Sequence, residues 1–371
     1  MAKQLSKTTK LNFLLFAIFL NLIPLAYYKY SPIENLTLPL AISFFTFQQI
    51  AFLVDVYKGK IKEFTFFEYS FFVMFFPQLI AGPIVHFNDL VNQVRDKKRF
   101  VADATYISAG IMLFSMGLFS KVVIADNLTL HSYKTWSDIF SYSFMIYFDF
   151  SGYASMAIGL ALMFGIILPI NFNSPYKSKN IIEFWRNWHI TLSNFLKEHI
   201  YIPLGGNRYG IKKQTFALLT TMVLGGIWHG YGLTFLLWGF FHGVALVVLN
   251  IIKKYNLINI PSNIFTNTIK ITLTFLYVSL LWVLFFSSDI HSAIDIYKGL
   301  FYADAFKNFN YWLIAVAILV FFTPNSTQII NLKEKGFAMK SYYGYLTGIL
   351  LFVSLKFMAE TPSMKFVYFN F

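Results

Sequence analysis

Cysteine is absent from all 371 residues of the chain. Its absence excludes disulfide bonds, a catalytic thiolate and S-palmitoylation. Any nucleophile or general base must therefore be a histidine, serine, threonine, tyrosine, lysine or carboxylate side chain. No cleavable signal peptide is apparent, and we expect residues 1–10, which contain three lysines, to form a short cytoplasmic tail.

Charged residues are also scarce: they make up 13% of the chain, whereas a soluble protein carries about 25%. Acidic residues are the rarer kind, with 17 Asp and Glu against 30 Lys and Arg, so the formal net charge is +13. We interpret this excess as the positive bias of cytoplasmic loops, with attraction of an anionic substrate as an added possibility. Because the basic residues are scattered through short loops, we expect no binding of nucleic acid.

Apolar residues dominate instead, at 57% hydrophobic and 20% aromatic. Stretches near 20 apolar residues recur from end to end, which indicates membrane-spanning helices rather than the short alternating segments of a β-barrel. We therefore predict an all-α, polytopic membrane protein that forms a single membrane domain over residues 1–371. The predicted apolar segments are 11–28, 38–54, 64–84, 105–125, 139–170, 214–229, 231–250, 268–287, 311–323 and 342–359.

One uncharged stretch is too long for a single membrane helix. It covers residues 214–250, and as a straight helix it would reach roughly 55 Å, beyond the ~30 Å hydrocarbon core of a bilayer. Irregular backbone at that depth survives only where protein or a water-filled cavity covers it. The expected break lies at four glycines: Gly225, Gly226, Gly230 and Gly232.

His229 stands at this break, between Trp228 and Gly230. The alternative reading, a packed histidine bonded to a neighbouring helix, is less favoured because a titratable group at an interrupted membrane helix typically marks a functional site. A neutral imidazole there can take a proton from an acceptor hydroxyl, as the general base of an acyl transfer. His229 is our first candidate catalytic residue.

Residues 181–200 have the spacing of an amphipathic helix, which suits the membrane interface or a cavity mouth. His189 lies on its apolar face. It is either an interfacial histidine whose ring reaches the headgroups or a site residue that orients the acceptor and stabilises developing charge. The other members of that face are Trp185, Trp188, Leu192 and Leu196.

Two further polar residues lie in apolar segments. Asp149 is a lone carboxylate that needs a partner or a wet cavity, so it either forms a structural pair or orients a histidine. His242 follows His229 on the next apolar segment, where we favour packing or support of the site.

Asn207 and Arg208 follow a glycine pair, and backbone N–H groups and a guanidinium there can bind phosphates. An ordinary turn with a charged end is the favoured alternative. No metal site is indicated, since no histidine pair has ligand spacing backed by carboxylates, and no serine nucleophile elbow or phosphate-binding loop motif occurs.

The basic loops do not give a consistent topology. Lys58, Lys60 and Lys62 place the loop after residue 54 in the cytoplasm, and Arg95 with its basic neighbours places the loop after residue 84 there too. Either the 64–84 segment is re-entrant or the second loop is an exception. Pro77 predicts a kink there, and Gly152 offers a break in the 139–170 stretch.

Eight motifs in order resemble the membrane-bound O-acyltransferases (MBOAT), in particular the alginate and peptidoglycan O-acetyltransferase branch. The resemblance is strongest over residues 38–250, and the teichoic acid D-alanyl transferase is a more distant match. The motifs are SFFTFQQ at 43–49, FPQLIAGP at 76–83, KVVIADN at 121–127, YFDFSGY at 147–153, NFNSPY at 171–176, FWRNWHI at 184–190, YIPLGGNR at 201–208 and GGIWHG at 225–230.

This resemblance implies a ring of tilted helices around a funnel in the inner (cytoplasmic) membrane of a bacterium. It implies that His229 matches the catalytic histidine and His189 the second histidine. We predict Asp149, Trp188, Trp228 and His242 as supporting residues of this site. The resemblance implies acetyl-CoA as the donor, no bound cofactor, and an SGNH-type periplasmic or membrane-anchored partner that esterifies an envelope polysaccharide.

Two departures from the family stand out. Relatives carry further membrane segments before the position of Ser43, and they often carry an aspartate where Ser155 stands. The sequence thus predicts O-acetylation of peptidoglycan or an alginate-like glycan. A membrane transporter and an inactive truncated scaffold for a periplasmic transferase are the alternatives.

Overall fold

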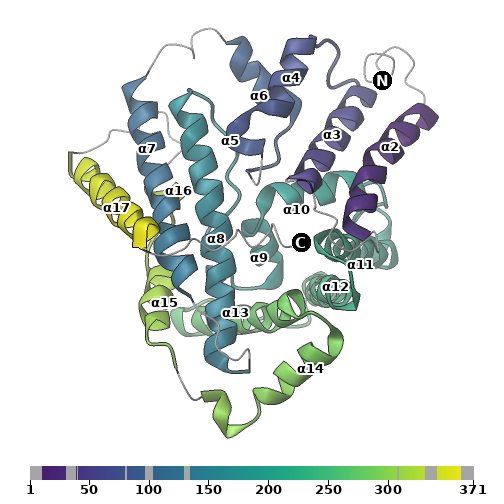
Figure 1. Cartoon of the computed structure of the whole chain (residues 1–371). Coiled ribbons are helices and arrows are strands. Elements are labelled where there is room, and N and C mark those ends of the chain that lie inside the picture. The colour runs from purple at the N-terminus through teal and green to yellow at the C-terminus, as the bar shows by residue number, and fades with distance from the viewer. Residues whose placement is uncertain are drawn as a thin grey trace.

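The computed structural model describes residues 11–30, 39, 41–79, 82–96, 103–128, 134–306, 309–330 and 341–360. Helices dominate these ranges and no strand occurs within them (Figure 1), which confirms the all-α prediction. The expected cytoplasmic tail, residues 1–10, lies outside the described residues. The α-helices are α2 (Leu11–Tyr30), α3 (Ile42–Tyr57), α4 (Phe66–Met74), α5 (Phe76–Leu79), α6 (Phe87–Arg95), α7 (Ala104–Phe119), α8 (Trp136–Met163), α9 (Ile181–Asn187), α10 (Ile190–Leu196), α11 (Gly210–His229), α12 (Leu233–Lys254), α13 (Ile264–Phe286), α14 (Ile290–Gly299), α15 (Trp312–Phe322), α16 (Ser326–Ile330) and α17 (Ser341–Glu360).

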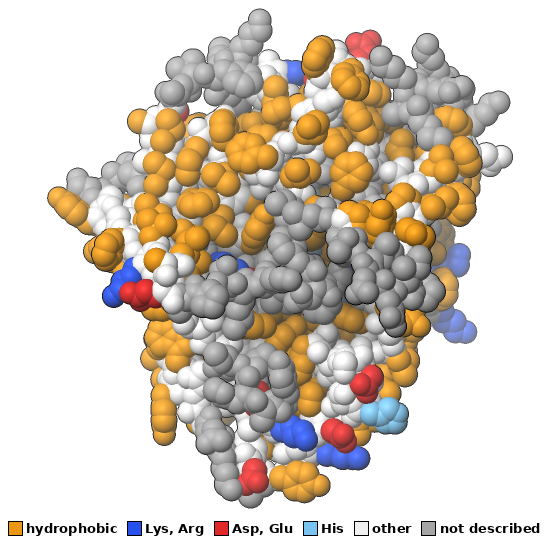
Figure 2. All heavy atoms as spheres, in the orientation of Figure 1, with side chains coloured by type: hydrophobic (Ala, Val, Ile, Leu, Met, Phe, Trp, Pro, Cys, Tyr) orange, Lys and Arg blue, Asp and Glu red, His pale blue; other side chains and the backbone are white. Residues whose placement is uncertain are grey.

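Six helices in the described part of the chain are long and apolar enough to cross a membrane. Large apolar side chains remain exposed along all of them except Trp136–Met163, and Figure 2 shows hydrophobic side chains over much of the viewed face with only scattered charges. The chain is therefore a multi-pass membrane protein. The six stretches are Leu11–Tyr30, Ala104–Asn127, Trp136–Met163, Leu233–Lys254, Ile264–Phe286 and Tyr342–Glu360.

Glycines allow α7 and α8 to pack backbone against backbone. A Cβ added at Gly117 would lie 2.5 Å from the backbone oxygen of Gly152, and one at Gly152 would lie 2.7 Å from that of Gly117. The prediction that Gly152 breaks the 139–170 stretch was wrong, because α8 passes through it as one helix of 28 residues. Small residues at a membrane helix interface permit this close approach.

The glycine-rich turn divides the long uncharged stretch into two antiparallel helices. α11 ends at His229, and α12 begins after Gly232, whose φ of 124° suits only glycine. The predicted break is therefore confirmed. The two helices touch closely, since a Cβ at Gly226 would lie 2.2 Å from the backbone oxygen of Phe235.

The segment after α3 does not form a full membrane span. α4 and α5 have nine and four residues, separated by an extended residue, Phe75, which lies two residues before Pro77, so the predicted kink is confirmed. α4 reaches only about 14 Å. α6 returns beside it, and the Nε atom of Arg95 lies 2.7 Å from a carboxylate oxygen of Glu68. These contacts favour the re-entrant alternative; Ile80 and Ala81 lie outside the described residues.

The predicted amphipathic helix over residues 181–200 is divided in the structure. α9 ends at Asn187, α10 begins at Ile190, and His189 between them adopts a left-handed backbone with φ 43° and ψ 53°. Trp188 and His189 are 1% and 0% exposed. The expectation of one continuous helix was therefore wrong, whereas its amphipathic character is retained, because Arg186, Asn194 and Lys197 stay exposed and the segment lines a cavity of about 330 Å³.

Candidate active site

His229 lies at the last residue of α11 in an aromatic environment. Its ring centroid lies 5.1 Å from that of Trp238 on α12, 5.1 Å from that of Phe285 on α13 and 4.7 Å from that of Trp228. It is 4% exposed. Three helices thus bring rings around one imidazole, which keeps bulk water away from it.

Gly230 allows the chain to leave α11 directly after His229. A Cβ at this position would lie 2.2 Å from the ring of Phe235. The extended backbone of Gly230 ends the helix, and its lack of a side chain lets the Phe235 ring pack against the turn. The glycine therefore determines both the end of α11 and the wall beside the histidine.

His189 is fixed by a hydrogen bond to a residue that sequence reasoning did not single out, Asn171. The Nδ1 atom of His189 lies 3.1 Å from Oδ1 of Asn171, and the same oxygen accepts from the hydroxyl of Thr191 at 2.9 Å. An amide oxygen only accepts. Nδ1 therefore carries the proton, and the basic lone pair of His189 is on Nε2. Asn171 belongs to a quoted motif, but the sequence contains no local sign of its role.

Aromatic rings join the two histidines into one core. The ring centroid of Phe44 lies 6.1 Å from that of His189 and 5.9 Å from that of Trp228. Phe150, on α8, contacts His189 at 4.7 Å. The structure therefore brings together the two histidines that lie 40 residues apart in the sequence.

His242 and His229 both contact the ring of Trp238. The Trp238 ring centroid lies 5.1 Å from that of His229 and 4.8 Å from that of His242. The Nε1–H of Trp185 donates to Nδ1 of His242 at 3.3 Å. His242 thus packs against Trp238 and Trp185, and its support of the site stays a prediction.

The tryptophans that precede the two histidines are packing residues of the same core. Trp228 stacks on Phe47 with ring centroids 5.0 Å apart and an interplanar angle of 20°. Trp188 is buried against Trp282, at 5.0 Å between ring centroids. Both rings set the positions of the histidines that follow them.

Asp149 forms an ion pair, one of the two roles left open for it. Its Oδ1 atom lies 2.8 Å from Nζ of Lys121, which also lies 2.6 Å from Oδ1 of Asp126. Both carboxylates are almost fully buried, so one ammonium group partly compensates two buried charges. Asp149 therefore stabilises the junction between α8 and the end of α7.

Asn207 and Arg208 lie away from the histidines. Both are exposed in the turn that precedes α11. His229 is at the opposite end of this 20-residue helix, which is about 30 Å long. The structure does not bring the two weakly predicted donor-binding residues into the histidine cluster.

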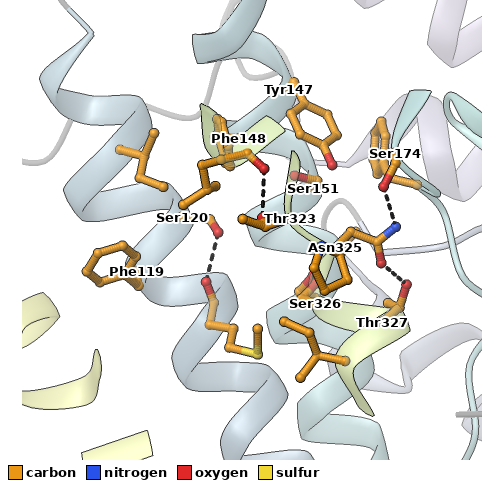
Figure 3. A pocket seen from close by; sticks show the side chains of 18 of the residues that line it. Phe119, Ser120, Tyr147, Phe148, Ser151, Ser174, Thr323, Asn325, Ser326 and Thr327 are labelled. Atoms are coloured by element: carbon orange, nitrogen blue, oxygen red, sulfur yellow. Dashed lines mark hydrogen bonds between the residues drawn. The ribbon is translucent and has the colours of Figure 1, made fainter. Parts of the chain in front are cut away.

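A cavity of about 250 Å³ is lined in part by two residues that contact His189. Asn171 and Phe172 line it, and Phe172 also stacks on His189 at 6.4 Å between ring centroids. Figure 3 shows its polar side, where Nδ2 of Asn325 donates to Oγ of Ser174 at 2.9 Å. None of the described residues that line this cavity is charged.

Two further residues near the site, Lys29 and Tyr30 at the end of α2, were not predicted from the sequence. The Nζ atom of Lys29 donates to the backbone oxygen of Trp228, and the hydroxyl of Tyr30 donates to that of Ile227 at 2.6 Å. A lysine at the end of an apolar helix ordinarily indicates an anchor in the headgroups. The sequence therefore held no signal for a contact with α11.

Known proteins are similar in sequence to this chain over the region that carries the histidines. Residues 55–260 match the model of MBOAT, the membrane-bound O-acyltransferase family. The chain is 44% identical to the peptidoglycan O-acetyltransferase of Helicobacter pylori, over 72% of this chain and 57% of that protein. It is 39% identical to the probable alginate O-acetylase AlgI of Pseudomonas aeruginosa, over 72% of this chain and 52% of that protein.

A teichoic acid D-alanyltransferase of Bacillus subtilis is 28% identical over 70% of this chain and 71% of that protein. The chain spans about half the length of the peptidoglycan and alginate relatives. The matched residues include α8 to α12, which hold His189, His229 and His242. The chain belongs to the membrane-bound O-acyltransferase family.

Proposed function

We propose that this protein is an O-acyltransferase that moves an acetyl group through the membrane for O-acetylation of an envelope polysaccharide, with His229 as its essential base. The observation that carries the proposal is the position of His229, at the end of α11 where the uncharged stretch 214–250 breaks, enclosed by Trp228, Trp238 and Phe285. The two relatives named above for O-acetylation of peptidoglycan and alginate support the same chemistry.

The proposed reaction needs a group that first accepts a proton from the attacking hydroxyl and then gives it to the leaving group. The neutral imidazole of His229 takes the proton of an acceptor hydroxyl as its oxygen attacks the carbonyl carbon of an acetyl thioester. The carbon–sulfur bond then breaks, and the imidazolium returns the proton to the leaving thiolate. The products are an acetyl ester and a free thiol, and the histidine ends as it began.

His189 has a supporting role in this scheme. Its ring is held by Asn171 and lies in the aromatic core that also contains Trp228. Fixed polar groups in a water-excluded site stabilise developing charge at little reorganisation cost. We assign to His189 the orientation of the acceptor or the stabilisation of charge on the reacting carbonyl.

The donor and partner follow from the same proposal. Acetyl-CoA is the proposed cytoplasmic donor, because a thioester that reacts at a membrane-embedded histidine does not need to bring its charged nucleotide across the bilayer. The proposed location is the bacterial inner membrane. An SGNH-type periplasmic or membrane-anchored transferase would then place the acetyl group on peptidoglycan or an alginate-like glycan.

Replacement of His229 tests the proposal. In cells that depend on this chain, His229→Ala should abolish ester-linked acetate on the envelope glycan while the protein still inserts into the membrane. His291→Ala is the matched control, because His291 is exposed on α14 and should leave acetate unchanged. Retention of acetate in the His229→Ala strain would remove His229 from the mechanism.

A further inference from the structure

The last two residues of α2 close the end of α11. The final carbonyl groups of a helix lack partners within that helix, and α11 ends with an extended glycine, Gly230. Lys29 donates to the Trp228 carbonyl, and Tyr30 donates to the Ile227 carbonyl at 2.6 Å. Two consecutive side chains from the N-terminal helix therefore cap the turn that carries the candidate base.

Lys29 adds a charge to this cap. Its Nζ atom lies 5.3 Å from the ring centroid of Trp228, a distance at which a cation is attracted to an indole face. A cation at the C-terminal end of a helix is also favourable, because the helix dipole is negative there. The ammonium group of Lys29 bonds the carbonyl of Trp228, the residue directly before His229.

We propose that Lys29 is a positioning residue for the acyl-transfer reaction: by holding the Trp228 carbonyl, it fixes the turn that orients the His229 imidazole. This inference rests on the proposed function, in which His229 is the base. α2 lies outside residues 55–260, which match the family model. The N-terminal helix would thus complete a site whose histidines all come from the matched region.

The expected consequence of losing Lys29 is slower chemistry rather than weaker binding. A misplacement of about 1 Å in a reacting group can lower a rate by about 100-fold. Lys29→Met keeps the apolar stem and removes the ammonium group. We expect it to lower kcat for hydrolysis of acetyl-CoA to acetate and free thiol, with water as the acyl acceptor in vesicles that contain the full chain, by about 10- to 100-fold. KM for acetyl-CoA should stay within about threefold, because Lys29 contacts the helix end rather than the donor.

Two matched variants separate the role of Lys29 from general support of the fold. Lys29→Arg keeps a cationic donor and should restore most of kcat. Lys270→Met removes a lysine whose Nζ atom donates to a backbone oxygen at an exposed position far from His229, that of Ile260 at 3.4 Å, and it should retain kcat within about threefold. Lys29→Gln, an uncharged donor, is measured beside Lys29→Met, and every rate is divided by the amount of folded protein in the membrane.

The results decide between the inference and its alternatives. A normalised kcat equal to wild type in Lys29→Met or Lys29→Gln would overturn it, and so would a Lys29→Arg protein as slow as Lys29→Met. His229→Ala is measured in the same vesicles. If His229→Ala stays active, the proposed function fails; if it is inactive while Lys29→Met is fully active, only the assignment of Lys29 fails.

Discussion

The side-chain oxygen of Asn171 holds His189 in one tautomer. It lies 3.1 Å from Nδ1 of His189 and also accepts hydrogen bonds from the hydroxyl and backbone N–H of Thr191, at 2.9 and 3.3 Å. The bonds to Thr191 fix the amide, and the amide then fixes the ring. His189 itself adopts a left-handed backbone, which costs a non-glycine residue energy and often occurs at functional sites.

Replacement of Asn171 should therefore lower the rate of acyl transfer, because His189 would lose its fixed orientation. Asn171→Leu has a similar volume and no acceptor, so Nδ1–H of His189 loses its partner. We expect ester-linked acetate to form at least about tenfold more slowly, the scale on which outer partners of site residues matter. Asn88→Leu is the control, because Asn88 makes an exposed bond to the backbone of Lys60. Equal acetate in both strains would show that Asn171 does not set the position of His189.

The buried ion pairs of Lys121 predict an effect on stability. Lys121→Met leaves Asp126 and Asp149 without their shared cation, and loss of one partner of a buried pair costs about 3–5 kcal/mol. Unfolding in one detergent, followed by heat or denaturant, measures this loss.

Lys356→Met serves as the control for Lys121→Met. Lys356 and Glu360 form an exposed pair at 3.9 Å, which contributes about 0–1 kcal/mol. Similar unfolding midpoints for the two variants would contradict a stabilising role for Lys121.

Close packing between α11 and α12 predicts intolerance of any side chain at Gly226. A Cβ there would lie 2.2 Å from the backbone oxygen of Phe235, and overpacking of this kind costs about 1–3 kcal/mol. Gly226→Ala should lower the unfolding midpoint and, by moving the end of α11, the rate of acetylation.

Gly348→Ala gives the opposite expectation for the same chemical change. Gly348 lies on α17 with no atom within 4 Å of its added Cβ. The extra methyl group should leave stability unchanged or raise it by up to about 1 kcal/mol, because alanine is the better helix former. A larger loss in Gly348→Ala than in Gly226→Ala would show that helix contact does not explain the effect.

Features with a local cause could be predicted from the sequence. The length of the uncharged stretch, together with its glycines, predicted where α11 ends and placed His229 at that end. The apolar segments predicted most long helices for the same reason, since bilayer thickness sets their length. His242 could be placed beside the site from its position on the following segment.

Features that depend on another helix were missed. Gly152 reads as a break in isolation, but α7 packs against it and keeps α8 continuous. Residues 181–200 have a helical period, but the helix breaks at His189. Beside this break, the backbone N–H of Ile190 donates at 2.9 Å to the backbone oxygen of Asn171, a residue outside the helical segment. Lys29 contacts a carbonyl 199 residues later in the chain, and no local pattern can indicate such a contact.

The most direct test of the central claim compares ester-linked acetate in strains that carry wild-type, His229→Ala or His291→Ala protein at equal levels in the membrane. The account predicts acetate at the wild-type level in the His291→Ala strain and none above background in the His229→Ala strain. Acetate in the His229→Ala strain equal to that of the wild type would contradict the account, because the acyl transfer would then proceed without the buried histidine.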